Sequence, residues 1–161
     1  MEDSAKANQY FDQADQLLDA GDGKRAMKIF YRSAFFGRVA AMHSIAHCYL
    51  YGIGVEPDYD EAFHWFTNAA ACGCPQGMYH LGLCNEEGFG TPKNGRLALE
   101  WYMKSAERGD EDAEHRVGRC HENGVGTAVN LAEAKKWYAR AAARGQAEAQ
   151  ERLAAFERRQ P

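Results

Sequence analysis

A period of 36 residues runs through most of the chain. Trp65, Trp101 and Trp137 lie 36 residues apart (101 − 65 and 137 − 101). The same step relates several glycines, alanines and cysteines: Gly37, Gly73, Gly109 and Gly145; Gly52, Gly88 and Gly124; Gly54, Gly90 and Gly126; Ala62, Ala98 and Ala134; and Cys48, Cys84 and Cys120. Self-similarity at one fixed period is typical of stacked repeats, each of which buries its apolar face against its neighbours. The period therefore indicates a repeat architecture.

Each repeat is predicted to contain two helices. In "AAMHSIAHCYLYGIG", residues 40–54, apolar or small side chains recur at helical spacing. Gly52 follows the last apolar position, where a left-handed cap favours glycine. The second helix is predicted to begin after a preferred N-cap residue, which is Asp58, Asn94 or Asn130 in successive copies. Asn130 and Glu133 also match a capping box.

Small residues inside the first helices indicate close packing. Ala46, Gly82 and Gly118 occupy equivalent positions. Glycine costs about 1 kcal/mol relative to alanine inside a helix. Because Gly82 and Gly118 both accept this cost, we predict that a neighbouring helix packs too close to these positions to leave room for a side chain.

The repeated residues resemble a known family. The best copy is "AMHSIAHCYLYGIGVEPDYDEAFHWFTNAAACG", residues 41–73. It is similar to the Sel-one-like repeat, a relative of the tetratricopeptide repeat with the approximate pattern A-x-x-x-L-G-x-x-Y-x-x-G-x-G-V, a short loop containing D, and A-x-x-W-[YF]-x-x-A-A-x-x-G. Later copies depart from it: Tyr49 is replaced by Asn85 and His121, and Val55 by Thr91 and Thr127.

The resemblance implies an all-α fold, an α-solenoid in which antiparallel helix pairs stack into a superhelix. We predict a single repeat domain over residues 1–161. Residues 5–38, which contain "AGDGKRAMKIFYRSAFFG", resemble a tetratricopeptide unit with a shorter loop. Sel-one-like repeats are predicted at 40–74, 75–110 and 111–146. Residues 147–159 are predicted to form one amphipathic helix that caps the last repeat.

Composition and charge argue against several classes of function. The net charge of −4 argues against general nucleic-acid binding, which needs a basic excess. No apolar run is long enough to span a membrane. The first residues are acidic and polar, unlike a secretory signal, and the five cysteines are odd in number, as suits a reducing compartment. We therefore expect a cytoplasmic protein that binds neither nucleic acid nor membranes.

Single motifs give little support for nucleotide binding, metal binding or cysteine chemistry. The Gly-x-Gly pairs lack the third glycine of a dinucleotide fingerprint and the Lys-Ser/Thr of a Walker loop. His43 and His47 share a helix face but, with only Cys48 nearby, lack further metal ligands. Cys72-Gly73-Cys74 is not a Cys-x-x-Cys pair, and the periodic cysteines are expected to be buried as small apolar residues. We predict no cofactor, no metal site and no catalytic residue.

The periodic glycines and tryptophans are assigned structural roles. The tryptophans are expected in the core, because each recurs with its packing partners. The residues with expected structural roles are Gly52, Gly54, Trp65, Gly82, Gly88, Gly90, Trp101, Gly118, Gly124, Gly126 and Trp137.

The resemblance implies that function lies in a concave groove lined by the first helices. In related repeats, groove positions vary between copies. Carried onto this chain, they are His43, His47, Leu50 and Tyr51 in one repeat, Tyr79, Leu83, Glu86 and Glu87 in the next, and His115, Arg119, Glu122 and Asn123 in the third. Aromatic, aliphatic and charged side chains of both signs suit a peptide or protein segment.

The leading hypothesis is a protein-interaction scaffold or adaptor that binds a partner segment in this groove. The resemblance also implies bacterial signalling and host-contact systems, where the family is common. Alternatives are a hydrolase that uses the groove histidines, an inhibitor or immunity-type binder, and structural self-assembly. Weak self-association is predicted from charge, since residues 1–22 carry six acids against one lysine, and residues 135–159 carry seven basic residues against three acids.

Overall fold

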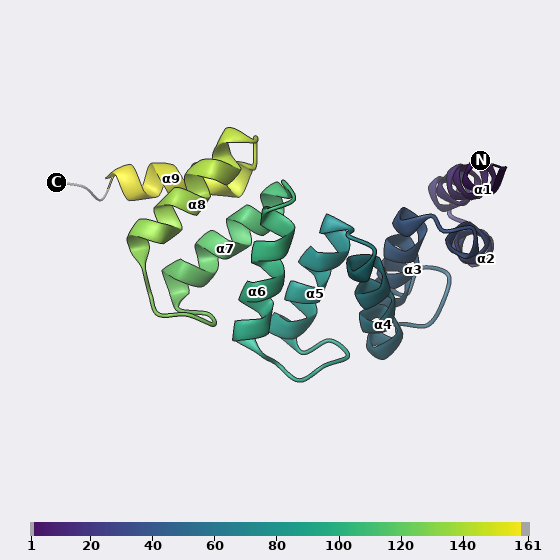
Figure 1. Cartoon of the computed structure of the whole chain (residues 1–161), viewed down its shortest axis with the longest axis horizontal. Coiled ribbons are helices and arrows are strands. Elements are labelled where there is room, and N and C mark those ends of the chain that lie inside the picture. The colour runs from purple at the N-terminus through teal and green to yellow at the C-terminus, as the bar shows by residue number, and fades with distance from the viewer. Residues whose placement is uncertain (1, 159–161) are drawn as a thin grey trace. The chain divides into compact units, whose positions relative to one another are not determined.

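The computed structural model describes residues 2–158, apart from the side chain of residue 157. Within this range the chain forms nine α-helices and no β-strand (Figure 1). The helices are α1 (Glu2–Asp19), α2 (Gly23–Phe35), α3 (Val39–Tyr51), α4 (Tyr59–Ala71), α5 (Pro75–Glu87), α6 (Gly95–Ala106), α7 (Glu111–Asn123), α8 (Leu131–Ala143) and α9 (Ala147–Arg158). The predicted all-α repeat fold is therefore confirmed. Arg159, the last residue of the predicted capping helix, lies outside the described residues.

Contacts divide the chain into two compact units. The first runs to Gly77 and includes Phe89–Thr91, and the second comprises Met78–Gly88 and the residues from Pro92 onward. In the first unit, α1 packs on α2, α2 on α3 and α3 on α4; in the second, α6 packs on α7, α7 on α8 and α8 on α9. The boundary falls inside α5, so the units do not coincide with whole repeats.

Left-handed glycines end the first helices of the repeats. Gly52 caps α3 with a φ of 69°, and Gly124 caps α7 with a φ of 73°. Their N–H groups donate to the carbonyl oxygens of Cys48 and Cys120. Because a side chain at these angles would be strained, the first glycine of each Gly-x-Gly pair serves as a helix cap, as predicted.

The loops to the second helices are closed in the same way in all three repeats. The three predicted N-cap side chains accept hydrogen bonds from N–H groups of the turn that follows: Asp58 before α4, Asn94 before α6 and Asn130 before α8. The N–H of each N-cap residue donates back to the first helix of its repeat, at the carbonyl oxygens of Tyr49, Asn85 and His121 respectively. The carboxylate of Glu133 accepts from Lys136 at 2.6 Å, so this loop uses the Asn130 half of the predicted capping box.

The second glycine of each pair lies where two repeats meet. A Cβ on Gly54 would overlap the backbone of Gly23, where α2 begins. Gly126 lies in the same way against Gly95 at the start of α6, and Gly90 against the carbonyl of Tyr59 at the start of α4. The loop of one repeat thus contacts the second helix of the repeat before it, backbone to backbone. This contact gives the Gly-x-Gly pairs a structural role.

The helical glycines Gly82 and Gly118 face aromatic rings. A Cβ on Gly82 would lie 2.5 Å from the ring of Tyr102, and one on Gly118 would lie 2.8 Å from the ring of Tyr138. Each ring belongs to the second helix of the same repeat. The predicted close approach is therefore confirmed, and its cause is the tyrosine that packs on the glycine.

The centre of each repeat is occupied by the residue that follows the tryptophan. Phe66, Tyr102 and Tyr138 are completely buried, whereas Trp65, Trp101 and Trp137 are only partly buried. The tryptophans, which were expected in the core, pack at its edge: Trp65 and Trp137 are partly buried and lie against core clusters. An indole is rarely buried completely because of its size, and here the rings of Trp101 and Trp137 lie beneath Lys104 and Arg140, at 4.1 and 4.3 Å.

The periodic cysteines belong to the core, as predicted. Cys48, Cys84 and Cys120 are 1–2% exposed and have free thiols. Burial raises the thiol pKa to about 11 for Cys48 and to about 12 for Cys84 and Cys120. Protonated, buried thiols are poor nucleophiles, so these residues act as small apolar side chains.

Candidate functional site

In the first unit, the predicted groove residues form an aromatic row along α3. The ring centroids of His43 and His47 lie 6.2 Å apart, and those of His47 and Tyr51 lie 4.4 Å apart. Tyr51 is 58% exposed, whereas Leu50 is only 7% exposed. Leu50 is therefore part of the buried core rather than an exposed groove residue. It points inward because residues one position apart on a helix face different directions.

Two predicted groove acids in the second unit are used internally. Tyr102 Oη donates to Glu86 at 2.6 Å, and Tyr138 Oη donates to Glu122 at 2.7 Å. Arg116 also contacts Glu86, and the side chains of Glu86 and Glu122 are only 18% and 13% exposed. These carboxylates satisfy the hydroxyl groups of buried tyrosines. Glu86 and Glu122 therefore have structural roles in place of the contact roles predicted for them.

The repeat register contains a signal for these pairs. Glu86 and Tyr102 correspond to Glu122 and Tyr138 in the next repeat, and to Leu50 and Phe66 in the repeat before. A carboxylate is present wherever the buried ring carries a hydroxyl, and leucine is present where the ring has none. Comparing first-helix and second-helix positions together, rather than one at a time, would have identified the pairing.

A polar pocket lies on the second unit, beside α7. Its volume is about 270 Å³, slightly below the range of about 300–1,000 Å³ that is usual for small-molecule pockets. Its lining residues come from α5, α7 and the start of α9: Tyr79, Asp112, His115, Arg116, Arg119, Gln146 and Glu148. The structure therefore brings together three predicted groove residues, Tyr79, His115 and Arg119. The other predicted residues of this unit do not line the pocket: Leu83, Glu86, Glu87, Glu122 and Asn123.

The arginine that sequence reasoning missed is held by the tyrosine–glutamate pair. Arg116 Nη1 lies 3.4 Å from Glu86 Oε2, the same oxygen that accepts from Tyr102. The Arg116 side chain is 21% exposed. A repeat-to-repeat hydrogen-bond network thus fixes one guanidinium at the pocket wall.

Gln146 organises the other end of the pocket. It caps α9, because its Oε1 accepts from the N–H of Ala149 at 2.6 Å. Its Nε2 donates to Asp112 at 3.3 Å and also to Glu148. One buried amide therefore holds the first turns of α7 and α9 together and positions both carboxylates. The sequence predicts Gln146 only as the last residue of the third repeat, 111–146, and not as a contact of this pocket.

His115 lies between these charges. Burial lowers its pKa from the usual value, and the positive charge of Arg119 lowers it further. The ring therefore stays neutral at neutral pH and offers one N–H donor and one acceptor.

Removing the Arg119 charge should raise the pKa of His115. In Arg119→Ala we expect the His115 pKa to move up toward 6.5, because one of the causes of its depression is gone. Proton NMR of the His115 ring across acidic and neutral pH measures this. Lys104→Ala removes an equal charge from α6 outside the pocket, and an equal pKa change in that variant would contradict the pocket geometry.

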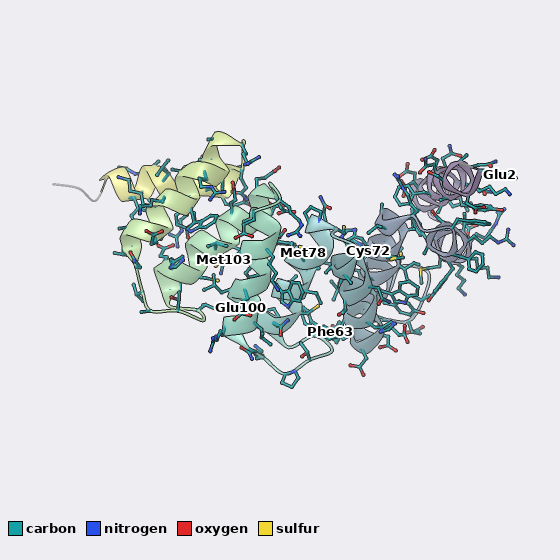
Figure 2. All side chains as sticks on the ribbon, in the orientation of Figure 1. Glu2, Phe63, Cys72, Met78, Glu100 and Met103 are labelled. Carbon is teal, nitrogen blue, oxygen red and sulfur yellow. The ribbon has the colours of Figure 1, made fainter. Side chains whose placement is uncertain are left out.

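The remaining chemical hypotheses gain no support from the structure. No group of three or more His, Cys, Asp or Glu side chains within residues 2–158 is arranged to hold a metal ion. The pocket lining, as far as the chain is described, contains no serine or cysteine nucleophile. Cys72, exposed after the C-terminal end of α4 (Figure 2), and Cys74 both have free thiols. Nothing therefore points to catalytic activity.

Between residues 2 and 158, no helix combines the length and the apolar character needed to cross a bilayer.

Comparisons with known proteins identify the repeat. The Sel1 repeat matches residues 39–74, 75–110 and 111–146. The crystal structure of a Sel1 repeat protein from Oxalobacter formigenes is similar, with 32% identity and a TM-score of 0.86 over 91% of this chain and 60% of that one. A search of curated proteins found no match.

A second solved structure is c5321, a protective antigen present in uropathogenic Escherichia coli strains that displays an SLR fold. It shares 30% identity and a TM-score of 0.76 over 82% of this chain and 28% of that one. The chain therefore spans less than two thirds of the length of either structure. Three matched repeats cover most of the sequence, and the chain belongs to the Sel1 repeat family.

Proposed function

We propose that the chain is a scaffold or adaptor that binds a segment of a partner protein on its first-helix faces. Sel1 repeats generally mediate protein–protein interactions. The observation that carries the proposal is the pocket beside α7, where Tyr79, His115 and Arg119 gather in partly buried positions. Tyrosine and arginine are common energetic anchors of protein interfaces, especially in sites that are partly closed to water.

The exposed aromatic row on α3 supports the same function in the first unit. Tyr51 offers a large, rigid contact area with a polar hydroxyl, and His47 packs against it. Burial lowers the pKa of His47, so its ring is largely neutral at neutral pH. We assign the protein to a reducing, cytoplasmic compartment, which its five free thiols support.

Site-specific photo-crosslinking in host cells tests the proposal. A photoreactive amino acid at position 119 should capture a partner, whereas the same group at position 104, exposed on α6, should not. Arg119→Ala should then weaken the purified complex by more than about 1 kcal/mol, the usual effect of an anchor residue. Lys104→Ala is the matched control and should leave the affinity unchanged.

Arg119 is the cleanest position for this test. It makes no hydrogen bond or ion pair with the described side chains, so its loss should leave the melting temperature nearly unchanged. Tyr79 is less suitable, because its ring contacts Tyr102, with centroids 5.8 Å apart, and packs on the core. Cross-links that form only at position 104, with Arg119→Ala neutral, would place the interface on the second helices and overturn the proposal.

A further inference from the structure

The pocket beside α7 has opposite charges at its two ends. Asp112 lies in the first turn of α7. Glu148 lies near it, because the side-chain amide of Gln146 donates hydrogen bonds to both carboxylates. Arg119 lies seven residues further along the helix. At a rise of 1.5 Å per residue, Asp112 and Arg119 are separated by about 10 Å along the axis. The neutral ring of His115 lies between them in sequence and lines the same pocket.

The charges at both ends lack partners of opposite sign within the described chain. Arg116 is paired with Glu86, but no described carboxylate forms an ion pair with Arg119. Asp112 and Glu148 share the neutral amide of Gln146, and no described lysine or arginine forms an ion pair with either carboxylate. The lining side chains carry two positive and two negative charges. A ligand of one charge sign would therefore be attracted at one end and repelled at the other.

We propose that this pocket binds a stretch of a partner protein that carries both an acidic and a basic side chain. The acidic group contacts Arg119, and the basic group contacts Asp112 and Glu148. The inference rests on the proposed function and adds the chemistry of the partner. An extended chain rises about 3.3 Å per residue, so two side chains three residues apart span the same 10 Å. The expected segment has the form Lys-x-x-Asp, or its reverse.

Blocked hexapeptides on one Gly/Ser/Tyr background test this inference. One probe carries Lys and Asp three residues apart, and a second carries them adjacent. Two further probes replace Asp by Asn or Lys by Gln. Amide chemical shifts of the full chain report where each probe binds and its Kd. We expect the spaced Lys/Asp probe to bind about fivefold or more tightly than the other three, as for one favourable ion pair.

Size-matched variants assign each end of the pocket. Arg119→Gln should abolish the advantage of the acidic group and leave that of the basic group. Asp112→Asn combined with Glu148→Gln should do the reverse. Glu100→Gln, at an exposed position of α6 that Figure 2 labels, is the control and should change neither.

Three results would overturn the inference: equal binding of the four probes, variants that leave this discrimination unchanged, or no probe that shifts the pocket resonances. Equal binding at the pocket would still leave it as a peptide site of another chemistry. Failure of the proposed function is seen separately, as absent cross-links at position 119 in cells.

Discussion

Gly118→Leu should lower the free energy of unfolding by about 2–3 kcal/mol, the usual effect of overpacking a buried site. A Cβ at this position already lies 2.8 Å from the Tyr138 ring, and leucine adds three further carbons. Tyr138 is fully buried and its hydroxyl is bound to Glu122, so the ring cannot move away without breaking that hydrogen bond. Urea denaturation measures the loss.

The sign of the change makes this test decisive. Helix propensity alone favours leucine over glycine by about 1 kcal/mol, so an unhindered site would become more stable. Gly118→Ala should fall between wild type and Gly118→Leu. Arg96→Leu, at an α6 side chain that is 83% exposed, is the control and should change stability by less than about 0.5 kcal/mol. A stabilised Gly118→Leu would mean that α7 and α8 do not pack as described.

Sequence periodicity was sufficient to predict the two helices of each of the three repeats. Gly52 ends a helix by adopting a left-handed backbone conformation, and Asp58 begins one by capping its first turn. Both effects are local, so these residues indicate helix ends without knowledge of the tertiary structure. Gly118 was also informative, because a glycine that recurs inside a helix has an evident local cost. The identity of the ring that excludes a side chain there, Tyr138, depends on tertiary packing and came only from the structure.

The candidate site was harder to predict, because it depends on side-chain pairing across helices. Leu50 and Glu86 occupy equivalent positions, yet one is buried in the core and the other binds a tyrosine hydroxyl. Arg116 was overlooked because its orientation is fixed by Glu86 of another repeat. Gln146 was overlooked because it is the last residue of the third repeat and makes its contacts with the first turns of α7 and α9. The period identifies equivalent positions but not what each side chain contacts.

Glu114 illustrates a buried charge that the register could have revealed. It occupies the position of Met42 and Met78 and is completely buried. Its carboxylate lies 2.9 Å from Arg140 Nη2 and 3.3 Å from Arg144 Nε, and both arginines are about half exposed. An acid where two other repeats have methionine indicates a buried ion pair. Arg140 in α8 and Arg144, the C-cap residue of that helix, supply the two cations.

Replacing both cations should be costly, whereas replacing the anion should not. Arg140→Met/Arg144→Met keeps apolar stems but leaves Glu114 buried without a positive partner. We expect the free energy of unfolding to fall by about 2–4 kcal/mol. Breaking a fully buried ion pair usually costs about 3–5 kcal/mol, and the cost here is lower because the arginines are half exposed. Glu114→Met restores the residue of the other repeats and leaves two arginines that water can solvate. Its stability should lie within about 1 kcal/mol of wild type, or above it.

The triple variant Glu114→Met/Arg140→Met/Arg144→Met distinguishes two causes of the loss in stability. One is the missing attraction between Glu114 and the arginines, and the other is the buried carboxylate that they leave unpaired. It should recover most of the stability lost in the double arginine variant, because no buried carboxylate remains to be desolvated. Urea denaturation of the four proteins gives the comparison. If Glu114→Met is as destabilising as the double arginine variant, and the triple variant is worse than either, the ion pairs themselves stabilise the fold and the desolvation argument is wrong.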